Sequence, residues 1–266
     1  MRRPRFVRRV APDEKLTIVE HLDELRRRIF VSIGALVLAF IVMYAFHKDL
    51  MSWLQRPLPG DQVLVTLAVS EAFFTVVKVS AYAALIVALP IWLYQLYAFI
   101  IPAVGEQPRR KMLVVVAGIS SLFFVGAAFG YYIVLPVALK WLQSFGDGLF
   151  ATQLRAQDYY SFVSMFVLAS GLMFELPVAM LGLARLGIVQ AGVYLRHWRV
   201  AVVIIAVVAA ALPGGDPFSM MMLMAPQLVL YAFGYWLART FGREAPWNRT
   251  SEETTVADGT TTSSPP

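Results

Sequence analysis

A charged stretch stands directly before the first long apolar run of the chain: EHLDELRRR at residues 20–28, followed by apolar residues 29–46. Three consecutive arginines hold their end of a membrane span in the cytoplasm, because segments rich in Lys and Arg resist translocation. Read as a helix, the stretch places Glu20 and Glu24 on one face with Arg27 and Arg28, beside an apolar stripe at spacings of three and four. We therefore predict an amphipathic cytoplasmic helix that leads into a membrane span.

The acids of this helix have two possible roles. Glu24 can simply pair with Arg28 one turn later, a contact worth roughly 0.2–0.5 kcal/mol. Alternatively, Glu20 and Glu24 offer carboxylates to a cationic partner at the membrane surface. The spacing alone leaves both interpretations open.

The composition indicates an all-α integral membrane protein. Of 266 residues, 59% are hydrophobic and only 15% are charged, and the mean hydropathy is +0.65, whereas soluble domains are about 25% charged. The net charge of +6 reflects cations at the ends of spans, so we expect a lipid bilayer and no nucleic acid as partner. The absence of cysteine excludes disulfides and thiol chemistry, and the three scattered histidines predict no metal site.

Six apolar runs predict six transmembrane helices, at residues 29–46, 73–103, 112–139, 159–184, 200–212 and 218–238. The fifth run would make only about 20 Å of helix, short against a hydrocarbon core of roughly 30 Å. We expect three parts: a basic arm with the amphipathic helix at 1–28, a six-span domain at 29–238, and a disordered polar tail at 239–266. Lys and Arg concentrate in the segments that lie on the side of the N-terminus, which predicts a multi-pass protein of the cell membrane with both termini cytoplasmic.

Glu175 is the most informative single side chain. It lies in GLMFELP, residues 171–177, deep within the fourth predicted span, where an acid costs on the order of 2.5–3.5 kcal/mol to insert. Such residues usually line pathways or sites, although Glu175 could also serve only to join helices by hydrogen bonds. Pro177 removes one backbone donor, which frees the carbonyl of Met173 and should bend the helix near Glu175.

Other features of the spans carry weaker expectations. Prolines at 90, 102, 136 and 226 should kink or end their helices, which favours a concave bundle. Gln95 and Gln227 are expected to form hydrogen bonds between helices. The following aromatic residues are expected mostly in the belt at the membrane surface: Tyr94, Tyr97, Phe99, Tyr131, Tyr132, Tyr159 and Tyr160.

No motif of an enzyme is present. The chain has no phosphate-binding loop, no HExxH, no GxSxG and no paired carboxylates at catalytic spacing. We therefore expect neither enzymatic activity nor a cofactor, and any work must come from binding energy, partners or the membrane potential. A proton- or ion-coupled transporter of small solutes that uses Glu175 is one hypothesis, and a passive scaffold is another.

Five motifs in order resemble the TatC family, the multi-span receptor of the twin-arginine protein translocase. They are HLDELRRR at 21–28, SEAFF at 70–74, YQ at 94–95 with Phe99 and Pro102, FELP at 174–177 and DPFS at 216–219. The similarity extends from about residue 16 to residue 238. It implies a six-helix, glove-like fold that binds twin-arginine signal peptides of folded proteins. It also implies single-span TatA-like and TatB-like partner subunits, a homo-oligomeric receptor complex and export driven by the proton-motive force.

The resemblance assigns roles to particular residues. Glu24 would bind the signal peptide with Glu20, Arg26, Phe99 and an acid of the first inner loop. The family's Glu–Arg–Arg reads Pro-Arg-Arg here, at 108–110, so the second carboxylate would come from Glu106 or from Glu20.

The same resemblance assigns two further groups of residues. Glu175, Pro177 and Gln95 would form the intramembrane polar region that contacts partner subunits. Pro57 and Asp216 would belong to the loops of the outer face.

Overall fold

The computed structural model describes residues 18–59, 62–104, 109–144, 153–211 and 217–242. Helices make up nearly all of this part of the chain, and Val65 and Arg155 form one isolated β-bridge. The elements are α1 (Ile18–Ala45), α2 (His47–Gln55), α3 (Glu71–Val104), α4 (Arg109–Phe129), the π-helical turn η1 (Gly130–Val134), α5 (Leu135–Ser144), α6 (Ala156–Phe174), α7 (Leu176–Arg185), α8 (Ala191–Arg196), α9 (Trp198–Ala211) and α10 (Pro217–Phe241).

The prediction of an all-α membrane protein is confirmed. Five helical stretches within the described residues are long and apolar enough to cross a bilayer: Leu22–Ala45, Glu71–Phe99, Met112–Ser144, Ala156–Arg185 and Met220–Phe241. The fifth predicted span corresponds to α9, a shorter apolar helix of 14 residues, or about 21 Å.

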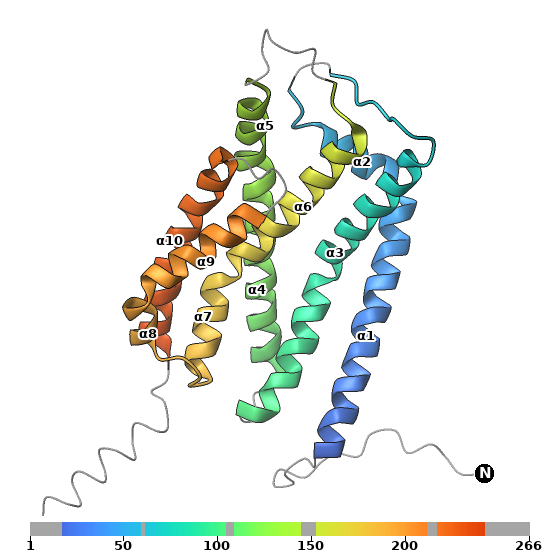
Figure 1. Cartoon of the computed structure of the whole chain (residues 1–266). Coiled ribbons are helices and arrows are strands. Elements are labelled where there is room, and N and C mark those ends of the chain that lie inside the picture. Colours follow the sequence, from blue (N-terminus) through green and yellow to red (C-terminus); the bar gives the residue numbers. More distant parts are fainter. Residues whose placement is uncertain (1–17, 60–61, 105–108, 145–152, 212–216, 243–266) are drawn as a thin grey trace, which may run out of the picture.

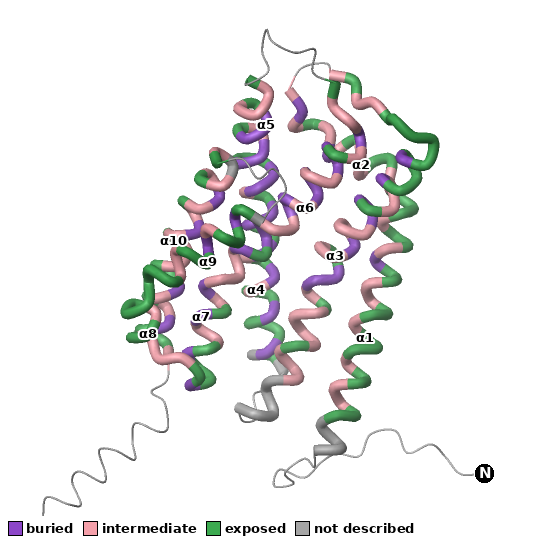
Figure 2. The backbone as a smooth tube through the Cα atoms, in the orientation of Figure 1, coloured by how far each residue is buried: buried purple, intermediate pink, exposed green. Residues whose placement is uncertain are grey.

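The helices pack as a sequence of neighbours across the molecule. Helix α1 packs on α3, which in turn contacts α4 and α6, and α10 packs against α7 and α9 (Figure 1). Buried residues concentrate on α4 and α6, whereas α1 and α9 are exposed over most of their length (Figure 2). Because the exposed side chains of α1 and α9 are largely Val, Leu, Ile and Phe, these surfaces suit hydrocarbon rather than water.

Glycines let α4 and α6 approach closely. A Cβ atom at Gly126 would lie 2.5 Å from the ring of Phe174, and one at Gly171 would lie 2.6 Å from the ring of Phe123. Small residues at helix contacts are the common means of close packing in membranes, where the hydrophobic effect does not drive helices together. The α4–α6 pair is therefore the tightly packed centre that holds the other elements in place.

The amphipathic helix and the first span form one element. Helix α1 runs without interruption from Ile18 across the expected boundary at residue 28 to Ala45. The acid Glu24 is thus rigidly connected to the membrane-spanning part of α1.

Most of the prolines do not end their helices. Helix α3 continues through Pro90 and Pro102, and α10 continues through Pro226. Pro136 is the second residue of α5, one residue after the end of the π-helical turn η1, and Pro177 follows the break between α6 and α7. The regular α-helix is thus interrupted next to Pro136 and Pro177, whereas α3 and α10 continue through their prolines.

Helix α2 is held by tyrosine hydroxyls. Tyr131 donates to the carbonyl of Trp53, and Tyr159 donates to that of Leu54 at 2.9 Å. These carbonyls lie in the last turn of α2, where helical donors run out, and that of Trp53 also accepts the N–H of Arg56 at 3.2 Å. Tyr131, Tyr159 and their neighbour Tyr160 are at most 5% exposed, so these three of the seven aromatic residues expected mostly in a surface belt are instead packed inside the protein, where their hydroxyls bond α2.

Candidate functional site

Arg28 bonds both Glu24 and Gln95 at the end of the bundle where α1 begins. The Nε atom of Arg28 lies 3.1 Å from Oε1 of Glu24, and Nη2 of Arg28 contacts the same oxygen. Nη1 of Arg28 donates to Oε1 of Gln95 at 3.3 Å, and Nη2 donates to the carbonyl of Ala98 at 3.1 Å. Arg28 therefore connects the acid on α1 to two acceptors on α3.

This site is partly open. The side chains of Arg28 and Glu24 are 21% and 28% exposed. Phe99 follows Ala98 directly on α3 and is half-buried. Arg26 is exposed on α1, with its guanidinium 5.7 Å from the ring of Phe30. A carboxylate, a guanidinium and an aromatic residue thus gather where α1 meets α3, within reach of an external ligand.

Three of the predicted site residues lie outside the described residues or have no described side chain. Glu106 and Asp216 lie outside the described residues, and Glu20 lies in α1 without a described side chain.

Two other predicted residues are described. Pro57 lies in the turn after α2, beside the backbone hydrogen bond from the N–H of Leu58 to the carbonyl of Gln55. Gln95 was grouped with Glu175 on the resemblance, but its hydrogen bond connects it to the Glu24 site.

Glu175 lies at the break between α6 and α7. Its Oε1 atom is buried and has no hydrogen-bond partner among the described residues. Two residues before it, the carbonyl of Met173 accepts a hydrogen bond from Nε2 of Gln227 at 3.0 Å. Because Pro177 has no N–H to donate to Met173, the amide of Gln227 on α10 supplies a donor in addition to the backbone N–H at the end of α6 that contacts the same carbonyl. The predicted interhelical roles of Gln95 and Gln227 are both confirmed.

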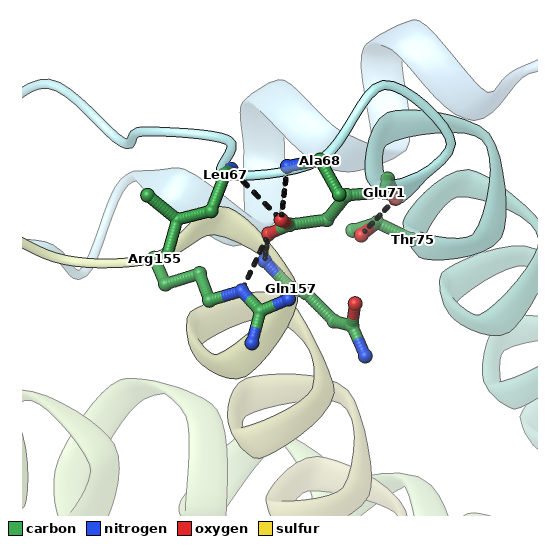
Figure 3. A network of polar contacts seen from close by, with 6 residues as sticks. All are labelled: Leu67, Ala68, Glu71, Thr75, Arg155 and Gln157. Carbon is green, nitrogen blue, oxygen red and sulfur yellow. Dashed lines mark hydrogen bonds and ion pairs between the residues drawn. The ribbon is translucent and has the colours of Figure 1, made fainter.

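Sequence reasoning missed the role of Glu71, although its motif was noticed. Glu71 begins α3, is 2% exposed, and accepts hydrogen bonds from the backbone N–H groups of Leu67 and Gln157 and from Nε of Arg155 (Figure 3). The N–H of Ala68 contacts the same carboxylate at 3.3 Å. This network joins the segment before α3 to the start of α6, next to the β-bridge. An acid at a helix start is a known capping signal, but its partners on α6 could not be read from the sequence.

The described side chains do not gather into a metal centre. In the part of the chain that the structure covers, no three His, Asp or Glu side chains gather closely enough to hold a metal ion. The arrangement instead offers charged and hydrogen-bonding groups at a helical membrane surface. These features define the class: a polytopic helical membrane protein with a partly open polar site at one end and a half-buried acid within its spans.

Comparison with known proteins gives the family. The family model described as "Sec-independent protein translocase protein (TatC)" matches residues 20–226. The chain is 39% identical to the chloroplastic TATC protein of Arabidopsis thaliana over 236 residues, covering 87% of this chain and 69% of that protein. It is 35% identical to TatC of Synechocystis over 90% of this chain and 94% of that protein.

The fold agrees with these matches. The crystal structure titled "Twin Arginine Translocase Receptor- TatC" superposes with a TM-score of 0.76 at 32% identity, over 84% of this chain and all of that one. The chain belongs to the TatC family of Sec-independent protein translocase proteins. Family membership favours protein translocation over the hypotheses of a small-solute transporter and of a passive scaffold.

Proposed function

We propose that this protein is the signal-peptide receptor of a twin-arginine translocase, with Glu24 as a carboxylate that binds an arginine of the signal. The observation that carries the proposal is the pairing of Glu24 with the guanidinium of Arg28 at a partly open site. Because the carboxylate of Glu24 already accepts hydrogen bonds from one guanidinium, it can also accept them from the guanidinium of a signal peptide. The signal peptide would bind where α1 meets α3, on the cytoplasmic side.

The chemistry explains why arginine rather than lysine would be required. A guanidinium forms two parallel hydrogen bonds with a carboxylate, and such charge-assisted pairs are strong and geometrically selective. A lysine supplies the charge without the fork. Two arginines need a second carboxylate, which Glu106 or Glu20 would supply, while Phe99 and Arg26 would contact the residues that flank the pair.

Photo-crosslinking with matched signal peptides tests this proposal. A photoreactive group near residue 24 should crosslink to an Arg–Arg signal, with a much weaker signal from the Lys–Lys form. Glu24→Ala should abolish the crosslink, because the guanidinium loses its acceptor. Asp23→Ala is the matched control, since Asp23 is an exposed acid on the neighbouring face of α1. Equal crosslinking of Glu24→Ala and wild type would refute the proposal, provided both proteins are folded in the membrane.

Glu175 would serve the partner subunits. A half-buried acid at a break between helices, whose buried Oε1 atom has no hydrogen-bond partner among the described residues, is a candidate to bind a polar group on a single-span TatA-like or TatB-like helix. We also propose that the receptor forms homo-oligomeric complexes and that export is driven by the proton-motive force. Glu175→Gln should weaken co-purification of the partner subunits while signal-peptide binding persists. Unchanged co-purification of both Glu175→Gln and Glu175→Ala would exclude this role.

The proposal includes six spans and two cytoplasmic termini. With about 21 Å of helix, α9 would cross only if the bilayer is thinner beside it. Such thinning would lower the barrier where export partners gather. The Lys and Arg residues near the start of α1 and near the end of α10 support the cytoplasmic orientation of both termini.

A further inference from the structure

We infer that Arg28 is an internal competitor that occupies Glu24 in the absence of a signal peptide and sets the affinity threshold of the receptor. The inference rests on the proposed function, because it concerns regulation of the same site. The sequence alone does not distinguish Arg28 from Arg26 and Arg27, whereas the contacts of its side chain do.

The anchoring of Arg28 exceeds what a simple helical pair requires. A surface Glu–Arg pair one turn apart needs only the contact between its two side chains. Arg28 bonds Glu24 through Nε and Nη2, while Nη1 reaches Gln95 and Nη2 also reaches the carbonyl of Ala98. The two acceptors on α3 fix the guanidinium and therefore hold it against the carboxylate.

The same geometry makes the exchange possible. Both contacts of Arg28 with Glu24 go to one carboxylate oxygen, Oε1. A guanidinium of the signal that binds Glu24 with its full fork must take over Oε1 as well. Arg28 then keeps its acceptors Gln95 and Ala98, so it is not left buried without partners. One guanidinium replaces another at Glu24, and the displaced guanidinium of Arg28 keeps two neutral hydrogen-bond acceptors.

Competition of this kind lowers the affinity for every signal by the same factor. The apparent dissociation constant rises as the fraction of molecules with an available Glu24 falls. Signals with two arginines still bind tightly enough to be retained, whereas weaker signals with one lysine do not. The competitor thus excludes poor signals without changing their affinity relative to good ones.

Binding of synthetic signal peptides to the full-length protein in nanodiscs tests the inference. Arg28→Gln should raise the affinity for Arg–Arg and Lys–Arg peptides alike, by about two- to fivefold, the range expected for a partly exposed ion pair. Arg27→Gln is the control, because it removes the same charge from the adjacent, exposed residue of α1. The increase with Arg28→Gln must exceed that with Arg27→Gln, since an equal increase would mean only a general charge effect and would overturn the inference.

Two further variants separate the possible outcomes. Arg28→Lys retains the charge but cannot bridge all three acceptors, so its affinity should also rise, and an affinity at or below wild type would contradict the inference even if Arg28→Gln fails to fold. In a Glu24→Ala background, Arg28→Gln should no longer raise the affinity. If Glu24→Ala alone binds normally, the proposed function fails. If Glu24→Ala abolishes binding but neither Arg28 variant exceeds Arg27→Gln, only the competitor is refuted.

Discussion

Glu71 and Arg155, 84 positions apart in the sequence, form an ion pair in which Nε of Arg155 lies 3.0 Å from Oε1 of Glu71. The pair connects the start of α3 to the start of α6. It is asymmetric, since the side chain of Glu71 is 1% exposed and that of Arg155 is 37% exposed. The hydrogen bond with Glu71 raises the pKa of Arg155 above its ordinary value, so Arg155 remains charged at any physiological pH.

Replacing Glu71 should therefore harm the protein more than replacing Arg155. Glu71→Leu would leave the N–H groups of Leu67 and Gln157 without their acceptor, and we expect the Tm in detergent to fall by on the order of 5 °C. Arg155→Gln should cost less, because Arg155 is partly solvated. The exchange Glu71→Arg with Arg155→Glu should not restore stability, since an arginine cannot accept the backbone donors. Full rescue by the exchange would show that only the charge pair matters.

The bond between Gln227 and Met173 should depend on Pro177. Gln227→Leu removes the donor that replaces the missing N–H of Pro177, and we expect a loss of about 0.6–1.7 kcal/mol, the range for hydrogen bonds between membrane helices. In a Pro177→Ala background the same substitution should cost less, because an alanine at this position supplies a backbone donor to Met173. Thermal or denaturant unfolding of all four proteins gives the coupling. Equal costs in both backgrounds would disprove the compensation.

The close approach of α4 and α6 predicts opposite effects for two glycines of α4. Gly126→Ala would place Cβ at 2.5 Å from Phe174, so overpacking should destabilise the protein by about 1–3 kcal/mol. Gly118→Ala meets no atom within 4 Å and should be neutral or stabilising by up to about 1 kcal/mol, because alanine is the better helix former. Unfolding measurements on the two variants check the difference, and a destabilised Gly118→Ala protein would contradict the packing described for α4.

The orientation can be tested with single cysteines, because the chain has none of its own. Ser52→Cys on α2 should react in intact cells with a maleimide that does not cross the membrane, whereas Thr240→Cys at the end of α10 should react only after lysis. Both residues are exposed, so accessibility within the fold is comparable. The opposite labelling pattern would invert the proposed topology.

Several features of the candidate site could be predicted from local sequence patterns. The acid of EHLDELRRR, the interhelical glutamines and the break before Pro177 each depend on residues close in sequence or on one side chain within an apolar run. Such features are determined locally, by helical spacing and by the missing N–H of proline. The identity of the helix that would satisfy Met173 was not accessible in this way, because Gln227 lies 54 positions away.

The sequence by itself determined that this chain is a helical membrane protein of the TatC family, since bilayer insertion depends on the length and hydropathy of each segment and the family on motifs in order. Only the tertiary structure decided that Arg28 links Glu24 to α3, that Glu71 joins the starts of α3 and α6, and that three tyrosines are buried against other elements. The reason is physical: a hydrogen bond needs a particular partner at about 3 Å, and which helices become neighbours depends on packing between segments distant in the chain.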